Sequence, residues 1–185
     1  DGGGFVLHGW GMGFVVCLDY VERYGLAGVR GLLVEDSVPQ LVAGGDWAAI
    51  GTDWAGLQGV MLGVAADRVA TLRGMFDSAL FFPGPPRLVE ANWRENCEPA
   101  LRLMAWPALL LELTSCGATW RPGVLAALRA ARVPALVLSG KGSFYRRDEK
   151  ARVARELGPD AQLVELESTG HAVWQSAPDA FLYHY

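Results

Sequence analysis

The sequence has few cysteines, no excess of positive charge and no long uninterrupted run of apolar residues. Its 3 cysteines form no even set and no metal-ligand spacing, which argues against a disulfide framework and a metal centre. The 16 Lys and Arg against 20 Asp and Glu leave a net charge of -4 and no basic surface for nucleic acid. The longest apolar run, residues 103–111, is too short to span a membrane and contains Pro107. We therefore expect no metal, cofactor, membrane span or nucleic-acid partner, and a reducing cytoplasm as the compartment.

The chain does have 51% hydrophobic residues and 23 glycines in 185 residues, which suits one globular α/β domain. Residues 44–120 break the alternation of strands and helices, with helical stretches at Gly56–Asp77 and Pro86–Leu113. Outside them we predict a mostly parallel sheet with flanking helices. Its strands are Gly4–His8, Val29–Val34, Val133–Leu138 and Gln162–Leu166, and its helices are Gly13–Tyr24, Pro122–Arg132, Arg147–Leu157 and the segment from Pro178 onward.

The segment from Gly9 to Gly13 reads Gly-Trp-Gly-Met-Gly and lies between an apolar strand and a predicted helix. The pattern G-x-S-x-G places a serine nucleophile on a tight strand-to-helix turn, with glycines on both sides where a Cβ would clash. Both flanking glycines are present, but Gly11 stands in the place of the serine. The sequence therefore predicts a nucleophile elbow that has no side chain to attack a substrate.

A nucleotide-binding turn is an alternative interpretation of the same glycines. Its fingerprint is G-x-G-x-x-G, followed by an acidic residue at the end of the next strand. Gly9 and Gly11 supply the first half, and Asp36 lies where the ribose-binding acid is expected. However, Phe14 stands in the place of the third glycine, and the bulky Trp10 fills the turn. A nucleotide-binding α/β module is therefore the third of our three functional alternatives.

Three separated segments, in this order, resemble the α/β-hydrolase superfamily over nearly the whole chain. Residues 6–41 resemble its elbow with the following helix and strand, residues 133–140 its penultimate strand, and residues 168–178 the loop of its catalytic histidine. The resemblance implies an α/β-hydrolase fold with a core of residues 1–43 and 121–185 and a helical cap of residues 44–120. It also implies an ester or lactone hydrolase lineage acting on a small apolar substrate or ligand.

His171 is the base that the resemblance implies. It follows a strand and Gly170, in a loop at the carboxyl end of the sheet, where a triad needs its histidine. His8 lies within the first predicted strand and His184 in the last few residues, so we expect both to be structural or exposed. The backbone N–H of Met12, the residue after the nucleophile position, is the expected oxyanion donor.

Two positions remain open for the catalytic acid. Most relatives place it after the penultimate strand in a G-x-x-D pattern, but here Ser143 occupies that place. Asp148, a few residues later, begins a predicted helix, where an acidic side chain stabilises the helix dipole. Other relatives place the acid one strand earlier, where this chain has Asp36, so we prefer Asp36 and keep Asp148 as the alternative. The neighbouring Glu35 is expected to point to the other side of the strand.

The missing nucleophile leaves the activity in doubt. Ser37 and Ser143 lie near the carboxyl ends of strands, but neither sits on a strained elbow, so both are weak substitutes. Gly11 also excludes a haloalkane dehalogenase, which needs an aspartate there. The chain is thus either a hydrolase silenced at one position or a ligand-binding or scaffolding pseudoenzyme.

Relatives carry further strands before the elbow strand, as the resemblance implies. We therefore expect the edge of Gly4–His8 to be covered by N-terminal strands that this sequence lacks or by a partner chain, because an uncovered apolar edge pairs with other chains. In the predicted cap, aromatic residues should form its core and partly line an apolar pocket. These residues are Trp47, Trp54, Trp93, Trp106, Phe76, Phe81 and Phe82.

Overall fold

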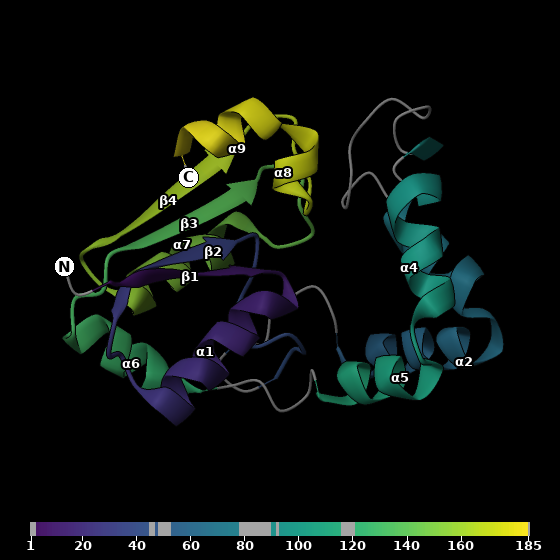
Figure 1. Ribbon diagram of the computed structural model, residues 1–185, viewed down its shortest axis with the longest axis horizontal. Helices are drawn as coiled ribbons and strands as arrows, with labels where there is room; N and C mark the ends of the chain where they lie inside the picture. The colour runs from purple at the N-terminus through teal and green to yellow at the C-terminus, as the bar shows by residue number, and fades with distance from the viewer. Residues whose placement is uncertain are drawn as a thin grey trace.

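The computed structural model describes residues 3–44, 47, 53–77, 90–91, 93–115 and 121–184. Four strands form one sheet in the order β1-β2-β3-β4, and every neighbouring pair is parallel (Figure 1). A parallel pair needs a crossover connection, and each crossover here contains at least one helix. The predicted α/β class with a mostly parallel sheet is therefore confirmed. The strands are β1 (Phe5–Trp10), β2 (Val29–Glu35), β3 (Ala135–Gly140) and β4 (Ala161–Leu166).

Helices cover both faces of this sheet (Figure 1). One face packs against the long helices in a core that includes Phe14, Leu128 and Val153. The other face carries the two short C-terminal helices, where Leu138 packs against Val173. The first group is α1 (Met12–Tyr24), α6 (Pro122–Ala130) and α7 (Arg147–Leu157), and the second is α8 (Val173–Ser176) and α9 (Pro178–His184).

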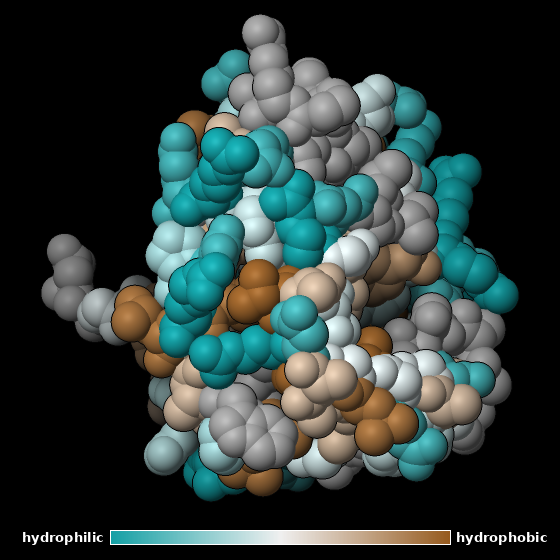
Figure 2. Space-filling model, turned by 90° about the vertical axis from the view of Figure 1, so that its right-hand side faces the viewer, coloured by the Kyte–Doolittle hydropathy of each residue, from teal (hydrophilic) through white to brown (hydrophobic). Residues whose placement is uncertain are grey.

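The helices between β2 and α6, which we call the helical insertion, gather beyond the end to which the strands point (Figure 1). They have a small apolar core of their own around Val64, Leu72 and Trp93. Its side chains Leu62 and Leu111 are exposed. Viewed from this side, the molecule shows hydrophobic groups between hydrophilic ones (Figure 2). The insertion consists of α2 (Trp54–Phe76), the π-helix η1 (Trp93–Cys97), α4 (Glu98–Leu103) and α5 (Trp106–Ser115).

The predicted helical stretch Pro86–Leu113 is wrong as one continuous unit. Met104 has extended backbone (φ -68, ψ 129) and separates α4 from α5. Pro107 follows in the first turn of α5, where its missing N–H is tolerated, whereas it would break a continuous helix. Helix α2 is also kinked at Asp67, whose Oδ1 accepts the N–H of Ala70 and so starts the second part like an N-cap.

Several boundaries and burial predictions differ from the structure in detail. Strand β1 extends beyond His8 because Gly9 and Trp10 continue the register with β2, and α8 was not predicted. Trp47, expected in the cap, is buried in the sheet core instead, whereas Trp54 is 53% exposed. Cys116, Phe81 and Phe82 lie outside the described residues, as do the side chains of Phe76 and Trp106.

Strand β1 lies at one edge of the described sheet and pairs with β2 alone. Its side chains Phe5 and Val6 are 39% and 57% exposed. A cover for this edge, by further strands or a partner chain, stays a prediction. Within the described ranges, no helix is both long and apolar enough to cross a membrane.

Candidate active site

Gly11 joins β1 to α1 in a backbone conformation that side chains rarely adopt, with φ 50 and ψ -120. The turn is fixed by hydrogen bonds: the Gly11 N–H donates to the Glu35 carbonyl at 3.1 Å, and the Gly11 carbonyl accepts the Ser37 hydroxyl at 2.5 Å. A Cβ at Gly9 would lie 2.4 Å from the backbone N of Phe14, so glycine is required there. This steric requirement does not apply to Gly13, where a Cβ would meet no described atom within 4 Å.

His171 and Asp36 form a buried pair at the same end of the sheet. The His171 Nδ1 lies 2.7 Å from Asp36 Oδ2, and the side chains are 8% and 0% exposed. Asp36 directly follows β2 with a positive φ of 42, and its N–H donates to the Leu138 carbonyl at 2.8 Å. His171 lies in the loop between β4 and α8. The structure thus brings together two of the predicted residues from loops 135 positions apart.

The Asp36 carboxylate accepts two further hydrogen bonds from serines. The Ser139 hydroxyl donates to Oδ1, and the Ser143 hydroxyl donates to Oδ2 at 2.6 Å. Sequence reasoning missed Ser139, because a serine at the end of an apolar strand carries no signal by itself. From the sequence, Ser143 was considered only as the residue in the usual place of the acid and as a weak nucleophile candidate.

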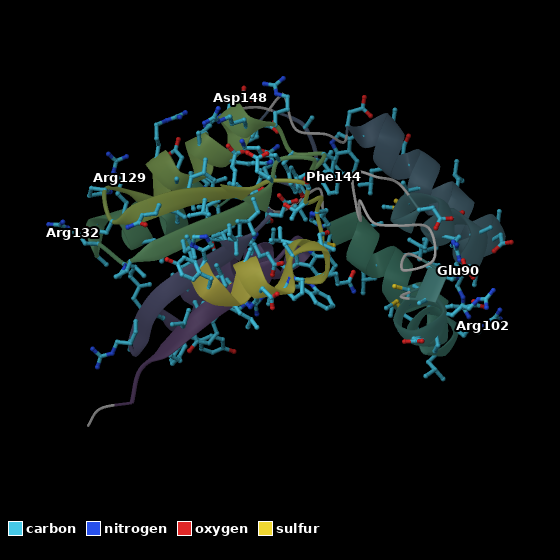
Figure 3. The ribbon with its side chains drawn as sticks, turned by 90° about the horizontal axis from the view of Figure 1, so that it is seen from above. Glu90, Arg102, Arg129, Arg132, Phe144 and Asp148 are labelled. Atoms are coloured by element: carbon cyan, nitrogen blue, oxygen red, sulfur yellow. The ribbon has the colours of Figure 1, made fainter. Side chains whose placement is uncertain are left out.

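Three aromatic rings surround the His171 imidazole. The ring centroids of Phe144, Trp10 and Tyr145 lie 4.5, 5.1 and 5.9 Å from that of His171. The indole N–H of Trp10 also donates to the His171 carbonyl at 2.9 Å. Phe144 lies where the sheet core faces the helical insertion (Figure 3). These contacts fix the imidazole orientation, and no sequence pattern predicted this role for Trp10 or Phe144.

The side of His171 away from Asp36 faces the turn at Gly11. A Cβ placed on Gly11 would lie 3.1 Å from His171 Nε2 and 3.3 Å from Cε1. A side chain at position 11 would therefore contact the ring nitrogen opposite the one that Asp36 engages. Met12, the expected oxyanion donor, is the first residue of α1, and its side chain packs near Leu57 of the insertion.

The structure does not bring Asp148 to this pair. Asp148 lies in the first turn of α7, with its side chain 67% exposed and paired with Arg146 at 2.6 Å. The hydrogen bond from Arg146 lowers the pKa of the Asp148 carboxyl. Figure 3 shows Asp148 at the outer surface, away from Phe144. Of the two acid positions, only that of Asp36 has its carboxylate on His171.

The two weak nucleophile candidates both direct their hydroxyl protons elsewhere. The Ser37 hydroxyl donates to the Gly11 carbonyl, and that of Ser143 donates to Asp36. His8 instead pairs with Glu35 at 2.9 Å, and His184 lies in α9 beside Tyr183. Among the described residues, no group of three or more His, Cys, Asp or Glu could hold a metal ion.

The arrangement can perform general acid–base chemistry. His171 can accept a proton at Nε2 while its Nδ1–H bonds to Asp36, whose negative charge stabilises the imidazolium. Gly11 lies next to this Nε2 but has no side chain that could attack a substrate. The structure thus brings Gly11, His171 and Asp36 together at one end of the sheet.

Comparisons with known proteins identify the family and the fold. Residues 1–182 match the model of the family described as "Alpha/beta hydrolase family". No curated protein matches the chain. Among solved structures, a bromoperoxidase from Bacillus anthracis matches with a TM-score of 0.81 at 17% identity, over 98% of this chain and 66% of that chain.

Two esterases give similar results. The esterase from Exiguobacterium antarcticum matches with a TM-score of 0.78 at 17% identity, over 98% of this chain and 65% of that chain. A thermophilic esterase from Thermogutta terrifontis matches with a TM-score of 0.62 at 22% identity, over 98% and 63%. At these identities the likeness concerns the fold alone. The chain spans just under two thirds of the length of these structures, 63% to 66%.

Proposed function

The chain belongs to the alpha/beta hydrolase family, and from that premise we propose that it descends from hydrolases of small carboxylic esters or lactones and is silenced at Gly11. One observation carries the proposal. A Cβ at Gly11 would lie 3.1 Å from His171 Nε2, while His171 Nδ1 lies 2.7 Å from Asp36 Oδ2. The Asp36–His171 pair therefore faces position 11, where glycine supplies no side-chain atom that could attack a substrate.

With a serine at position 11, each remaining group would have a defined task. His171 Nε2 would accept the hydroxyl proton while the serine oxygen attacks the ester carbonyl. The N–H of Met12, at the start of the 13-residue helix α1, would donate to the developing oxyanion. Asp36 would stabilise the imidazolium, which then protonates the leaving alcohol. With Gly11 no acyl-enzyme forms, so we expect no ester hydrolysis beyond a weak background.

The alternatives draw different support from the same site. A ligand-binding or scaffolding role is consistent with an intact elbow backbone that lacks only its side chain. A nucleotide-binding role finds less support, because the Asp36 carboxylate is fully buried and accepts bonds from His171, Ser139 and Ser143. That carboxylate is not placed to bind a ribose.

The test is to restore the side chain with Gly11→Ser and to measure hydrolysis of p-nitrophenyl acetate, p-nitrophenyl butyrate and a small lactone. We expect kcat/KM to rise by about three orders of magnitude or more over the unchanged chain, the scale of a triad nucleophile. Gly11→Ala is the matched control, because it adds the same Cβ at the same positive φ without a hydroxyl. Circular dichroism verifies that both variants fold, since a non-glycine residue at this φ costs about 1–3 kcal/mol.

Each result has a defined meaning. A folded Gly11→Ser variant no more active than Gly11→Ala would overturn the hydrolase proposal and favour the binding or scaffolding role. Activity already present in the unchanged chain and lost in His171→Ala would show that another group is the nucleophile.

A further inference from the structure

We propose that Ser139 and Ser143 set the proton affinity of the Asp36–His171 pair, by keeping Asp36 ionised in a site closed to water. The hydroxyl groups act on Asp36, so they are positioning residues for the base His171. The inference rests on the proposed function only in naming this pair as acid and base.

Burial alone would disfavour the ionised form of Asp36. Its side chain is 0% exposed, and a carboxylate removed from water stays charged only where hydrogen bonds replace its hydration. Here each oxygen has a donor: Ser139 on Oδ1, and Ser143 together with His171 on Oδ2, at 2.6 and 2.7 Å. Two neutral hydroxyls thus supply stabilisation that His171 alone cannot give to both oxygens.

The Ser143 hydroxyl is oriented for this task. Its oxygen accepts the N–H of Tyr145 at 3.1 Å, and its single proton is directed to Asp36. The loop that carries it is tied to the histidine loop, because the Gly142 N–H donates to the Thr169 carbonyl at 2.8 Å. The Lys150 ammonium donates to the Gly140 carbonyl at 2.6 Å and fixes the beginning of this loop. Ser143 and His171 therefore approach Asp36 from two loops that are joined to each other.

Charged groups on the neighbouring elements are paired with one another. Lys150 of α7 lies 3.6 Å from Glu165 of β4, and Glu35 of β2 lies 2.9 Å from His8 of β1. The Tyr145 ring, the further titratable group beside the imidazole, lies 5.9 Å from it between centroids. The serines, in contrast, bond to the Asp36 carboxylate directly, so their removal should act on the pair more than a change in these groups.

Removal of the serine hydroxyls should change the proton affinity of the Asp36–His171 pair in a predictable direction. A carboxylate with fewer donors is a stronger base, so the pair holds its proton to higher pH. The His171 ring should therefore hold its proton to a higher pH in Ser139→Ala and Ser143→Ala than in the unchanged protein, and to the highest pH in the double variant.

The experiment is an NMR titration of the His171 ring protons in the unchanged Gly11 protein and in these variants, with the signals assigned by their loss in His171→Gln. Ser143→Thr retains a hydroxyl and should titrate like the unchanged protein. Ser37→Ala is the matched control, because Ser37 is buried next to Asp36 but donates to the Gly11 carbonyl. It should leave the His171 pKa in place.

A second measurement uses the Gly11→Ser variant. There Ser143→Ala should move the acidic limb of the pH–rate profile upward by the same amount as the NMR shift, whereas a purely structural defect would lower the rate without moving the limb. A folded Ser143→Ala protein whose His171 pKa is unchanged or lower would overturn the inference. Ser143 lies in a partly exposed loop, so this variant decides even if Ser139→Ala does not fold. An NMR shift with an inactive Gly11→Ser variant would sustain the inference and refute the proposed function instead.

Discussion

Two histidine–carboxylate pairs meet at strand β2, and they differ in what lies beyond the histidine. The carboxylates are adjacent in sequence and both fully buried: Asp36 is 2.7 Å from His171, and Glu35 is 2.9 Å from His8. The far ring nitrogen of His171 faces the turn at Gly11. The His8 side chain is 32% exposed, and its ring lies 6.1 Å from that of Phe181 in α9. The same pair chemistry thus occurs both in the candidate active site and in the packing of the fold.

The second pair has a structural task. The other oxygen of Glu35 accepts the backbone N–H of Trp174 at 3.2 Å, in the first turn of α8. Because Trp174 is three residues after His171, Glu35 fastens the backbone of the histidine loop while Asp36 holds its ring. Strand β2 therefore anchors this loop through two consecutive carboxylates.

The largest expected effect separates the two histidines by activity. In the Gly11→Ser background, His171→Ala should lower kcat/KM for p-nitrophenyl butyrate by about three orders of magnitude, because the base is lost. His8→Ala should stay within about threefold, because His8 contacts Glu35 and not the elbow. Similar losses in both variants would contradict the division of tasks between the pairs.

The next effect concerns stability, for which we expect the Glu35–His8 pair to matter more than it does for activity. Glu35→Ala should lower the free energy of unfolding by about 3 kcal/mol, since it leaves both the Trp174 N–H and the His8 ring without this buried acceptor. Glu35→Gln keeps an acceptor and should lose about 1 kcal/mol. Urea unfolding at pH 7 measures both. A Glu35→Ala protein as stable as the unchanged one would show that the second pair does not hold the fold.

The smallest effect is expected at Asp148, the carboxylate that neither pair uses. Asp148→Asn should leave the activity of the Gly11→Ser variant within about twofold, because Asp148 is exposed and bonded to Arg146. Arg146 lowers the Asp148 pKa, so any stabilisation by this pair is present above the ordinary carboxyl pKa and lost as the pH falls through the lowered one. Unfolding midpoints at pH 7 and pH 3 check this sign. If Asp148→Asn lost as much activity as Asp36→Asn, Asp148 would have to be reconsidered as the catalytic acid.

Helix α7 offers a further comparison in its first turn, where burial raises the Glu149 pKa while Arg146 lowers that of Asp148. The contributions of Glu149 and Asp148 to stability should therefore change with pH in opposite directions. The favourable contribution of protonated Glu149 is present below the ordinary Glu pKa and is lost as the pH rises through the raised one. Unfolding of Glu149→Gln across pH 4 to 8 should show a weaker fall of stability with rising pH than the unchanged chain, and an identical pH dependence would contradict this.

The sequence by itself determined the order and approximate extent of the sheet elements. Apolar strands such as Val29–Glu35 and the helix Arg147–Leu157 are specified by local periodicity. The glycine spacing from Gly9 to Gly13 also predicted a tight turn between β1 and α1, although a Cβ would clash at Gly9 and not at Gly13. These features depend on neighbours within a few residues, so a single sequence contains them.

Only the tertiary structure decided which side chains meet. His171 bonds to Asp36 across 135 positions, Ser139 reaches Asp36 across 103, and Glu35 reaches Trp174 across 139. No local pattern encodes such partners, because they meet only when parallel strands bring the ends of distant loops to one edge of the sheet. The sequence thus named Asp36 and Asp148 as alternatives, and the packing of β2 beside β3 placed one of them, buried, against the histidine, and left the other in solvent with Arg146.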